Sequence, residues 1–430
     1  MQLDKANRMW MGKLPEDWKT KKIKYVLCQR NEDNASVKST DILSLTAKQG
    51  VIPYKDKKGG GNKPKQNFSA YKLAYPGDIV MNSMNILSGA VGLSKYMGCV
   101  SPVYYMLRPI SKKDDVRFFY YVFANKAFQH SLLGIGNGIL IRKSSTGTYN
   151  TIRTRIPIEK LNNLVIPYPT TSQQRSIADF LDKKCTEIDK LSTKIQQEIL
   201  DLKEYQKSLI YEMTTKGLSN DDLVDSPIPF FKKVNKNWSI TKIGHICTKL
   251  NRTFNANSPA LLCSNNGKVI YRPEAMKGKM LSEDHAMQGI HQGDIAIHGM
   301  DTWHGAIALS KYNGKITRVV HVCQSTEDNR FIVYYLQTLA YLGVYKLISN
   351  GVRGNTSDFR SWNKVKDIPI PIPSRKEQQD ICDYLDKVNQ NIENILDMKQ
   401  QILSKIAKYK NSLIYEYVTG KKQVPNLGEK

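Results

Sequence analysis

Polar and cationic side chains gather near glycine turns in two corresponding parts of the sequence. In the first part they are Lys55, Lys57, Lys63, Asn82, Asn85, Arg142, Lys143 and Ser144, and in the second they are Asn251, Arg252, His298, Asp301, Trp303, His304, Arg353 and Asn355. Cations neutralise phosphates, and planar polar groups hydrogen-bond to the edges of bases. These residues are therefore the candidate contacts to double-stranded DNA.

Two histidines of this set, His298 and His304, could instead form a metal site or a catalytic pair. No cysteine lies beside them, and no helical H-x-x-x-H spacing accompanies them, so we expect neither a bound metal nor catalysis there. A lysine-rich loop such as residues 55–65 is often only solvated. That interpretation stays open for each of its lysines.

The sequence lacks the motifs of several enzymes that act on DNA. It contains no G-x-x-x-x-G-K-[ST] loop, no Asn-Pro-Pro-Tyr-like motif and no G-x-G-x-x-G turn between a strand and a helix. Translocating motors, amino-methyltransferases and nucleotide-binding domains use these motifs. The acidic residues are too scattered to indicate a nuclease. We therefore predict a chain with no catalytic residue, cofactor or metal ion of its own.

The positive charge is concentrated in two blocks. The 430 residues carry a formal charge of +25, of which residues 1–160 contribute +16, 161–220 contribute 0, 221–370 contribute +7 and 371–430 contribute +2. Such an excess suits nucleic acid or an anionic membrane surface. With no apolar run that could span a bilayer, no stretch resembling a signal peptide and seven scattered cysteines, we expect a cytoplasmic protein with reduced cysteines.

An internal repeat sets the order of these blocks. Residues 165–215 align with residues 369–419 at a constant offset of 204, and 19 of the 51 pairs are identical, whereas about three identities are expected by chance. Residues 77–98 align with residues 293–314 at an offset of 216, with 11 of 22 pairs identical. The order is therefore basic domain, neutral segment, basic domain, neutral segment.

The two basic domains differ where their polar loops align. His298 and Asp301 replace Asn82 and Asn85, while the scaffold residues around them match. Different polar groups bind different base edges. The difference is therefore expected if each domain reads its own DNA sequence.

Each neutral segment has the heptad pattern of a long helix. Apolar residues recur with 3-4 spacing, which predicts a seam between two helices packed as a coiled coil. The expected packing residues are Leu181, Ile188, Ile195, Leu202 and Leu209 in the first segment and Leu385, Ile392, Ile395, Ile402, Ile406 and Leu413 in the second. Thr171 or Ser172, and Ser374, are candidate N-caps. A helix packed only on its own domain is the alternative.

The basic domains have mixed secondary structure. Short β-rich runs at Gly77–Met81, Val91–Ser94 and Val103–Leu107 lie among turns, and residues 116–130 and 331–347 are typical of buried helices. We predict an α+β fold with two mixed α/β domains, separated by two long helices that form an antiparallel coiled coil with a pseudo-two-fold repeat. The predicted boundaries are domains at residues 1–163 and 221–367, with helix segments at 164–220 and 368–430.

Several motifs resemble the specificity subunits of type I restriction-modification systems. They are Gly77-Asp78-Ile79-Val80, Gly89-Ala90-Val91-Gly92, Ser101-Pro102-Val103-Tyr104, and an Ile-Pro-x-Pro segment entering a helix with Glu377-Gln378. The resemblance extends over nearly the whole chain, although the first copy has Ser172-Gln173-Gln174 and lacks the glutamate. It implies two target recognition domains, one for each half of a bipartite, asymmetric DNA target.

The same resemblance implies partners for the chain. The helices would be conserved spacers that also dock two methyltransferase subunits, and endonuclease or translocase subunits would join the complex. S-adenosylmethionine, ATP and magnesium would then be bound by those partner subunits.

Two other functions stay open from the sequence. One is a self-contained DNA nuclease or modification enzyme on the same scaffold, and metal-dependent cleavage by the chain alone would indicate it. The other is a coiled-coil adaptor with non-specific basic domains. Equal affinity for random and genomic DNA would indicate that adaptor.

Overall fold

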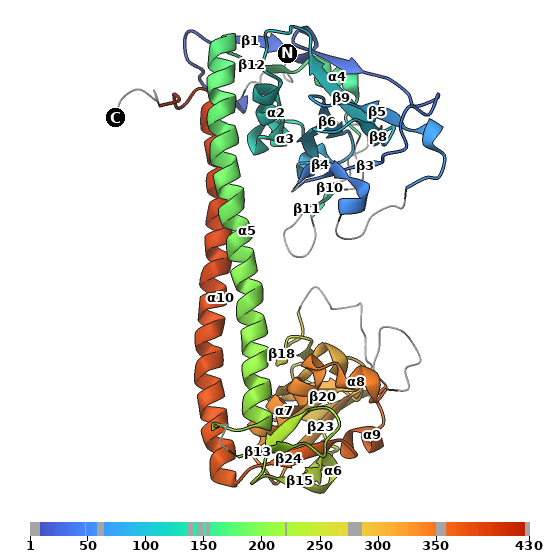
Figure 1. Ribbon diagram of the computed structural model, residues 1–430, viewed down its shortest axis with the longest axis vertical. Coiled ribbons are helices and arrows are strands. Elements are labelled where there is room, and N and C mark those ends of the chain that lie inside the picture. The colour runs from blue at the N-terminus through green and yellow to red at the C-terminus, as the bar shows by residue number, and fades with distance from the viewer. Residues whose placement is uncertain are drawn as a thin grey trace. The chain divides into compact units, whose positions relative to one another are not determined.

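The chain divides into two units, each with one basic domain and portions of both long helices (Figure 1). Unit 1 comprises residues 1–194 and 401–430, and unit 2 comprises residues 195–400. The computed structural model describes residues 9–47, 49–57, 64–133, 135, 141–143, 149–151, 155–219, 222–273, 286–349 and 358–425.

A four-stranded antiparallel sheet forms the centre of the unit 1 domain. Its order is β2 (Leu27–Arg30), β9 (Tyr104–Pro109), β6 (Ile79–Asn82) and β7 (Val91–Leu93). The two-stranded pairs are β3 (Leu43–Thr46) with β4 (Gly50–Pro53), β5 (Lys72–Ala74) with β8 (Gly98–Val100), β10 (Ile141–Lys143) with β11 (Tyr149–Thr151), and β1 (Lys19–Lys22) with β12 (Val165–Tyr168). The helices are α2 (Val116–Ala124), α3 (Lys126–Ser131) and α4 (Ile158–Asn162).

Unit 2 repeats this sheet with the same strand order. Its strands are β16 (Cys247–Leu250), β23 (Val320–Ser325), β20 (Ile295–His298) and β21 (Ile307–Leu309). The pairs are β17 (Leu261–Ser264) with β18 (Lys268–Tyr271), β19 (Met287–Ile290) with β22 (Gly314–Thr317), β15 (Ser239–Lys242) with β24 (Pro369–Ile372), and β13 (Leu223–Asp225) with β14 (Lys233–Asn235). The helices are α6 (Ile243–Ile246), α7 (Asn329–Tyr341), α8 (Val344–Leu347) and α9 (Trp362–Lys366). The predicted internal repeat is confirmed at the level of topology.

One inner strand of each sheet, β6 in unit 1 and β20 in unit 2, is buried on both faces and is called the central strand below. In β6, Ile79 and Met81 belong to the large core that contains the helices, whereas Val80 belongs to a smaller core under the β3–β4 pair. In β20, Ile295 and Ala296 divide between two cores in the same way. Successive side chains of a strand point to opposite faces, so a continuous apolar run is needed where both faces are covered.

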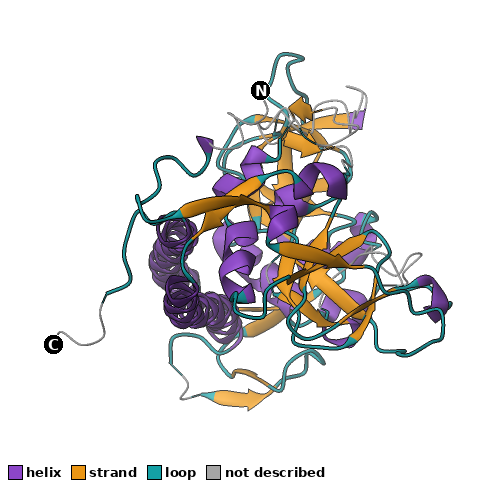
Figure 2. Cartoon of the chain, turned by 90° about the horizontal axis from the view of Figure 1, so that it is seen from above, coloured by secondary structure: helices purple, strands orange, loops and turns teal. Residues whose placement is uncertain are grey.

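The long helices α5 (Thr171–Thr215) and α10 (Arg375–Val418) lie side by side in each unit (Figures 1 and 2). In unit 1 the ring of Phe180 lies 4.5 Å from that of Tyr417, and Asp189 pairs with Lys410 at 2.6 Å.

In unit 2, Glu198 pairs with Lys399 at 2.6 Å, and Gln206 donates to Asn389 at 2.9 Å. Contact positions thus descend along α10 as they rise along α5. The predicted antiparallel pairing is confirmed within each unit.

Both helices also enter the cores of the basic domains. Leu181 and Leu413 belong to the same core as Phe118 in unit 1, and Leu385 belongs to the same core as Phe331 in unit 2. Near the domains, therefore, each helix packs on its own domain as well as on the other helix. The alternative of a helix packed only on its own domain is therefore wrong.

The seam on α5 follows the predicted row, and a second row lies beside it. Leu181 and Ile195 are buried and Ile188, Leu202 and Leu209 are half-buried. The companion positions that also turn away from water are Cys185, Ser192, Ile199, Gln206 and Met213.

On α10, Leu385, Ile392 and Leu413 are buried and Ile395 and Ile406 are half-buried. The prediction for Ile402 was wrong, because its side chain is 44% exposed. Lys399 and Leu403 occupy the seam there, and the ammonium of Lys399 reaches Glu198. A lysine can bury its stem at such a position while its charge stays paired at the edge.

The N-caps of the two long helices come from equivalent places. Ser374 Oγ accepts from the N–H of Glu377 at 3.2 Å, which confirms Ser374 as the cap of α10. Thr170 Oγ1 accepts from the N–H of Gln173 at 3.3 Å. Because α5 already begins at Thr171, its cap is Thr170. The prediction of Thr171 or Ser172 as the cap was wrong.

The helices and the cysteines bear on where such a protein could function. In the described part of the chain, no helix has the length and apolar character needed to cross a membrane. Cys28 is half-buried, the other six cysteines are buried, and all seven are free thiols. They therefore act as packing residues in this fold.

Truncation at two isoleucines of α10 tests the position of the seam. Ile392→Ala should lower the free energy of unfolding by about 2–5 kcal/mol, because it leaves a cavity in the seam. The same change at Ile402, which is 44% exposed, should cost less than about 1 kcal/mol. Denaturant titration followed by circular dichroism measures both. Equal losses would place Ile402 in the seam and contradict this structure.

Candidate nucleic-acid interface

Two loops with the same backbone hydrogen bonds follow the central strands. Residues 83–90 form one loop, with the 3-10 turn η4 (Ile86–Ser88), and residues 299–306 form the other, with η7 (Thr302–His304). Five bonds correspond at the offset of 216, and their donors are the N–H groups of Asn82, Asn85, Gly89, Ala90 and Val91 and of His298, Asp301, Gly305, Ala306 and Ile307. Gly89 and Gly305 end the turns with φ of +88° and +86°, a conformation that favours glycine.

The last side chain of each central strand holds the backbone of the following loop in place. Asn82 Oδ1 accepts from the N–H of Met84 at 3.0 Å. His298 Nδ1 accepts from the N–H groups of Met300 at 3.3 Å and Asp301 at 3.1 Å. Of the predicted DNA contacts, these two therefore position their loops through local hydrogen bonds.

The next polar side chains of the loops are more accessible. Asn85 and His304 are exposed, and the Asp301 side chain is 37% exposed. Asn85 presents an amide on the turn of unit 1, and Asp301 and His304 present a carboxylate and an imidazole on the corresponding turn of unit 2. These are the groups that discriminate between base edges in a groove.

The protonation state of His298 determines whether its ring can accept hydrogen bonds from the loop backbone. Burial lowers the pKa of His298, and the nearby Asp301 carboxylate, 3.3 Å from Nδ1, only partly offsets this effect. A neutral ring leaves Nδ1 able to accept the two backbone hydrogen bonds. Protonation at Nδ1 would break both of them.

A cation and two aromatic rings meet beside η7. Lys346 Nζ of α8 lies 4.2 Å from the centroid of the Trp303 ring, and the His304 ring centroid lies 4.3 Å from that of Trp303. Leu347, next along α8, is 80% exposed. Trp303 and His304 are among the predicted DNA contacts, but Lys346 is not, because no motif signals a contact across more than 40 residues.

Of the lysines predicted to contact DNA, only Lys55 and Lys57 have side chains among the described residues. Lys55 is exposed on η2 (Tyr54–Asp56), and Lys57 Nζ lies 5.6 Å from the centroid of the Tyr54 ring. Arg142 and Lys143 belong to β10, whose side chains lie outside the described residues. Lys63, Ser144, Arg353 and Asn355 also lie outside them.

Arg252 has an internal partner. Its Nε and Nη2 donate to the two carboxylate oxygens of Asp294 at 3.0 and 3.1 Å, and Asp294 is 0% exposed. In unit 1, Arg30 Nε donates to the buried Asp78 at 2.9 Å. The aspartate of each Gly-Asp-Ile motif is thus a structural anion, and Arg252 is engaged in the scaffold.

Each of these buried carboxylates also closes the turn before its strand. Asp78 accepts from the N–H of Tyr75 at 2.9 Å, and Asp294 accepts from the N–H of His291 at 2.8 Å. Asn251, beside Arg252, is exposed. A contact from Asn251 or Arg252 to DNA stays a prediction.

No group of three His, Cys, Asp or Glu side chains within the described ranges is arranged to hold a metal ion. His298 is engaged with backbone N–H groups through Nδ1, and the ring of His304 packs against Trp303. A DNA contact from these residues stays a prediction.

Residues 15–201 and 235–404 match the family model for the type I restriction modification DNA specificity domain. A protein described as the specificity subunit of type I restriction enzyme MjaX, from Methanocaldococcus jannaschii, is 22% identical over 447 aligned residues, which cover 96% of each chain. One solved structure comes from a study of complex assembly and conformational transition of the type I R-M system. Its chain matches this one with a TM-score of 0.67 at 13% identity, and the match covers 95% of this chain and 100% of that one. That likeness concerns the fold.

Replacement of His298 by asparagine should make the protein less sensitive to acid. Burial lowers the pKa of His298 below its ordinary value of 6.5, so the unfolded chain binds more protons than the folded chain. The stabilising contribution of the neutral ring is therefore complete above about pH 6.5 and lost as pH falls through the folded pKa. His298→Asn keeps an acceptor, as Asn82 does in unit 1.

The measurement is the midpoint of thermal unfolding between about pH 7.5 and about pH 5. The midpoint should fall less in His298→Asn than in the native protein. Some fall will remain, because burial also lowers the pKa of His321. An equal fall in both proteins would contradict the role assigned to His298.

Proposed function

The chain belongs to the type I restriction-modification DNA specificity family, and from that membership we propose that it reads a bipartite, asymmetric DNA target, with one recognition domain for each half. The domain of unit 1 would read one half and the domain of unit 2 the other. The base pairs between the halves would be unread.

The observation that supports this proposal is the pair of matched loops. Five backbone hydrogen bonds correspond between residues 82–91 and 298–307, so the two loops offer side chains on the same framework. The side chains differ at accessible positions: Asn85 of unit 1 is replaced by Asp301 in unit 2, and the second loop also carries the exposed His304. A common framework with different hydrogen-bonding groups is suited to reading two different sequences.

Phosphate contacts would supply much of the affinity. Residues 1–160 and 221–370 carry nearly all of the net positive charge, and binding by cations releases counterions from DNA. Binding should therefore weaken steeply as salt is added. Positions that contact only phosphate should affect all sequences equally.

The chemistry would be carried out by partner subunits. Two methyltransferase subunits, docked on the long helices and the adjoining domain faces, would bind S-adenosylmethionine and flip the target adenine. Endonuclease or translocase subunits would bind ATP and magnesium. This chain would contribute no catalytic group or cofactor, and it would act in the cytoplasm, where its DNA substrate lies.

Exchange of one recognition domain tests the assignment of halves. If residues 1–160 are replaced by those of a relative with another target, only one half of the methylated motif should change. Methylome sequencing of cells that express the chimera with the neighbouring methyltransferase measures the motif, and cells with the native chain are the control. A change in both halves would contradict the proposal.

Substitution of matched loop residues makes the same test at single positions. Asn85→Ala should relax base preference in one half, and Asp301→Ala should relax it in the other, each by about tenfold for a lost base contact. In vitro methylation of a target library by the assembled complex measures the preference. Lys184→Gln, a change on α5 away from both loops, should leave both halves unchanged.

A further inference from the structure

An arginine joins the recognition domain to α10 in unit 2. Arg330 Nη1 donates to Asp383 Oδ1 at 2.7 Å and to Asp386 Oδ2 at 2.9 Å, both on α10. Its Nη2 donates to Asp328, the N-cap of α7, at 3.2 Å. Tyr334, one turn along α7, donates its hydroxyl to the other oxygen of Asp386. We call these five residues the arginine clamp of unit 2.

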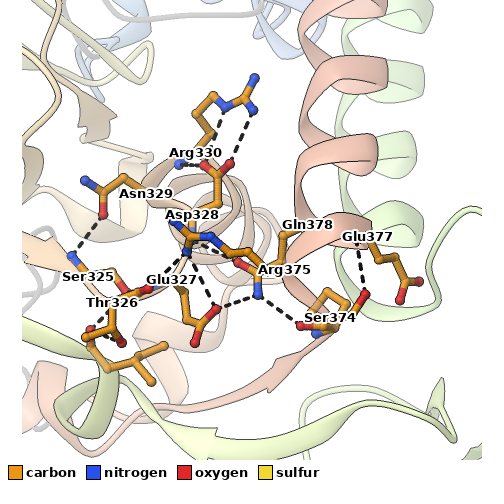
Figure 3. A network of polar contacts seen from close by, with 12 residues as sticks. Ser325, Thr326, Glu327, Asp328, Asn329, Arg330, Ser374, Arg375, Glu377 and Gln378 are labelled. Atoms are coloured by element: carbon orange, nitrogen blue, oxygen red, sulfur yellow. Dashed lines mark hydrogen bonds and ion pairs between the residues drawn. The ribbon is translucent and has the colours of Figure 1, made fainter.

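A buried amide reinforces the clamp (Figure 3). Gln378, in the first turn of α10, is 0% exposed. Its Oε1 accepts from the N–H of Asp328 at 2.9 Å, and its Nε2 donates to Glu327 at 2.7 Å and to the carbonyl of Pro373 at 3.0 Å. The oxygen and the nitrogen of one side-chain amide therefore connect the start of α7 to the start of α10.

The clamp of unit 2 extends across α10 to α5. Asn389 Nδ2 donates to the Tyr334 hydroxyl at 3.1 Å, and Gln206 Nε2 on α5 donates to Asn389 Oδ1 at 2.9 Å. A continuous set of hydrogen bonds thus runs from the recognition domain through α10 to the second long helix.

Unit 1 contains the same clamp on α2 and α5. Arg117 Nη1 donates to Asp179 Oδ1 at 2.7 Å and to Asp182 Oδ2 at 2.9 Å, and Tyr121 donates to Asp182 Oδ1 at 2.6 Å. Asp115 caps α2 and pairs with Arg117 at 2.6 Å.

The buried amide is repeated as well. Gln174 Oε1 accepts from the N–H of Asp115 at 3.0 Å. The arginine and its first aspartate partner lie 62 residues apart in unit 1 and 53 apart in unit 2. The same atoms meet although the intervening chain differs in length, so the contact itself is the repeated feature.

The clamp is better suited to fixing direction than to adding stability. The arginine side chains are 32% and 31% exposed, and Asp179 and Asp383 are 67% and 70% exposed. Ion pairs this open to solvent add little to the free energy of unfolding. A planar guanidinium with donors in a rigid fork does restrict the angle between the groups that it joins.

We propose that Arg117 and Arg330 are positioning residues that set how strictly the chain discriminates the number of base pairs between the two half-targets. This proposal rests on the proposed bipartite function. Each clamp holds a recognition domain at one angle on a long helix, and both long helices contribute to both units. A domain that swings on its helix would accept a half-target displaced by one base pair.

The test uses the chain assembled with its methyltransferase and DNA targets of native spacing or with one base pair added or removed. The readout is the ratio of methylation rates at native and altered spacing. Arg330→Gln and Arg117→Gln should each lower this ratio by about two- to fivefold, as expected for the loss of a solvent-exposed ion pair. The base preference within each half should stay the same.

Three further variants separate geometry from charge and from folding. Arg330→Lys keeps the charge but lacks the fork, so it should also lower the ratio. Tyr334→Phe removes one hydroxyl with little effect on packing and should lower the ratio to a smaller extent. Lys38→Gln removes a cation from a pair in the unit 1 domain outside the clamp, with Glu32 at 2.8 Å, and should leave the ratio unchanged.

The outcomes distinguish this inference from the function on which it rests. If the native complex shows no preference for a fixed spacing, the bipartite function fails. If it shows that preference and the arginine variants keep the native ratio, only the clamp proposal is overturned. An equal loss of methylation at every spacing would show a purely structural role and would also overturn it.

Discussion

The burial of one apolar row on each long helix is the constraint on which the rest of the structure depends. Neither α5 nor α10 can hide its row alone, and removing apolar surface from water drives the association. Near each domain the row enters a domain core, as Leu181 and Leu385 do. Elsewhere in each unit the two helices cover each other. The same row therefore holds each unit together.

Polar residues within the seam give it one register. Gln206 meets Asn389 and Lys399 meets Glu198, and all four residues are half-buried. A shift of either helix would leave these groups facing apolar neighbours, with the cost of unpaired polar groups in a partly dry environment. Apolar packing alone tolerates several registers, whereas these pairs favour one. The arginine clamps complement them at the junctions, where direction matters more than register.

The two recognition domains share a backbone scaffold and differ in the side chains that it presents to solvent. The buried ion pairs Arg30–Asp78 and Arg252–Asp294, the double-sided central strands and the turn glycines fix the same backbone in both copies. Accessible positions on that backbone carry different groups, and the stack of Lys346 on Trp303 beside η7 adds a cation and an aromatic face there. Such a division allows the chemistry of a loop to change without loss of the fold.

The sequence by itself determined the repeat, the two basic domains, the long helices and the family resemblance. These depend on local pattern and composition, and the offset of 204 is visible without any coordinates. The sequence also pointed to the loops at Asn82 and His298. What it could not separate was the side chain that holds a loop, such as His298, from one that faces outward, such as His304.

Only the tertiary structure decided which polar residues complete the seam, because Lys399 has no apolar character to mark it in the sequence, and its place in the seam follows from its pairing with Glu198. The same holds for Arg252, which looked available until Asp294 was found beside it. It holds again for the clamps, whose partners lie more than 50 residues apart. Contacts between distant residues depend on the packed arrangement of the elements, which a local pattern does not contain.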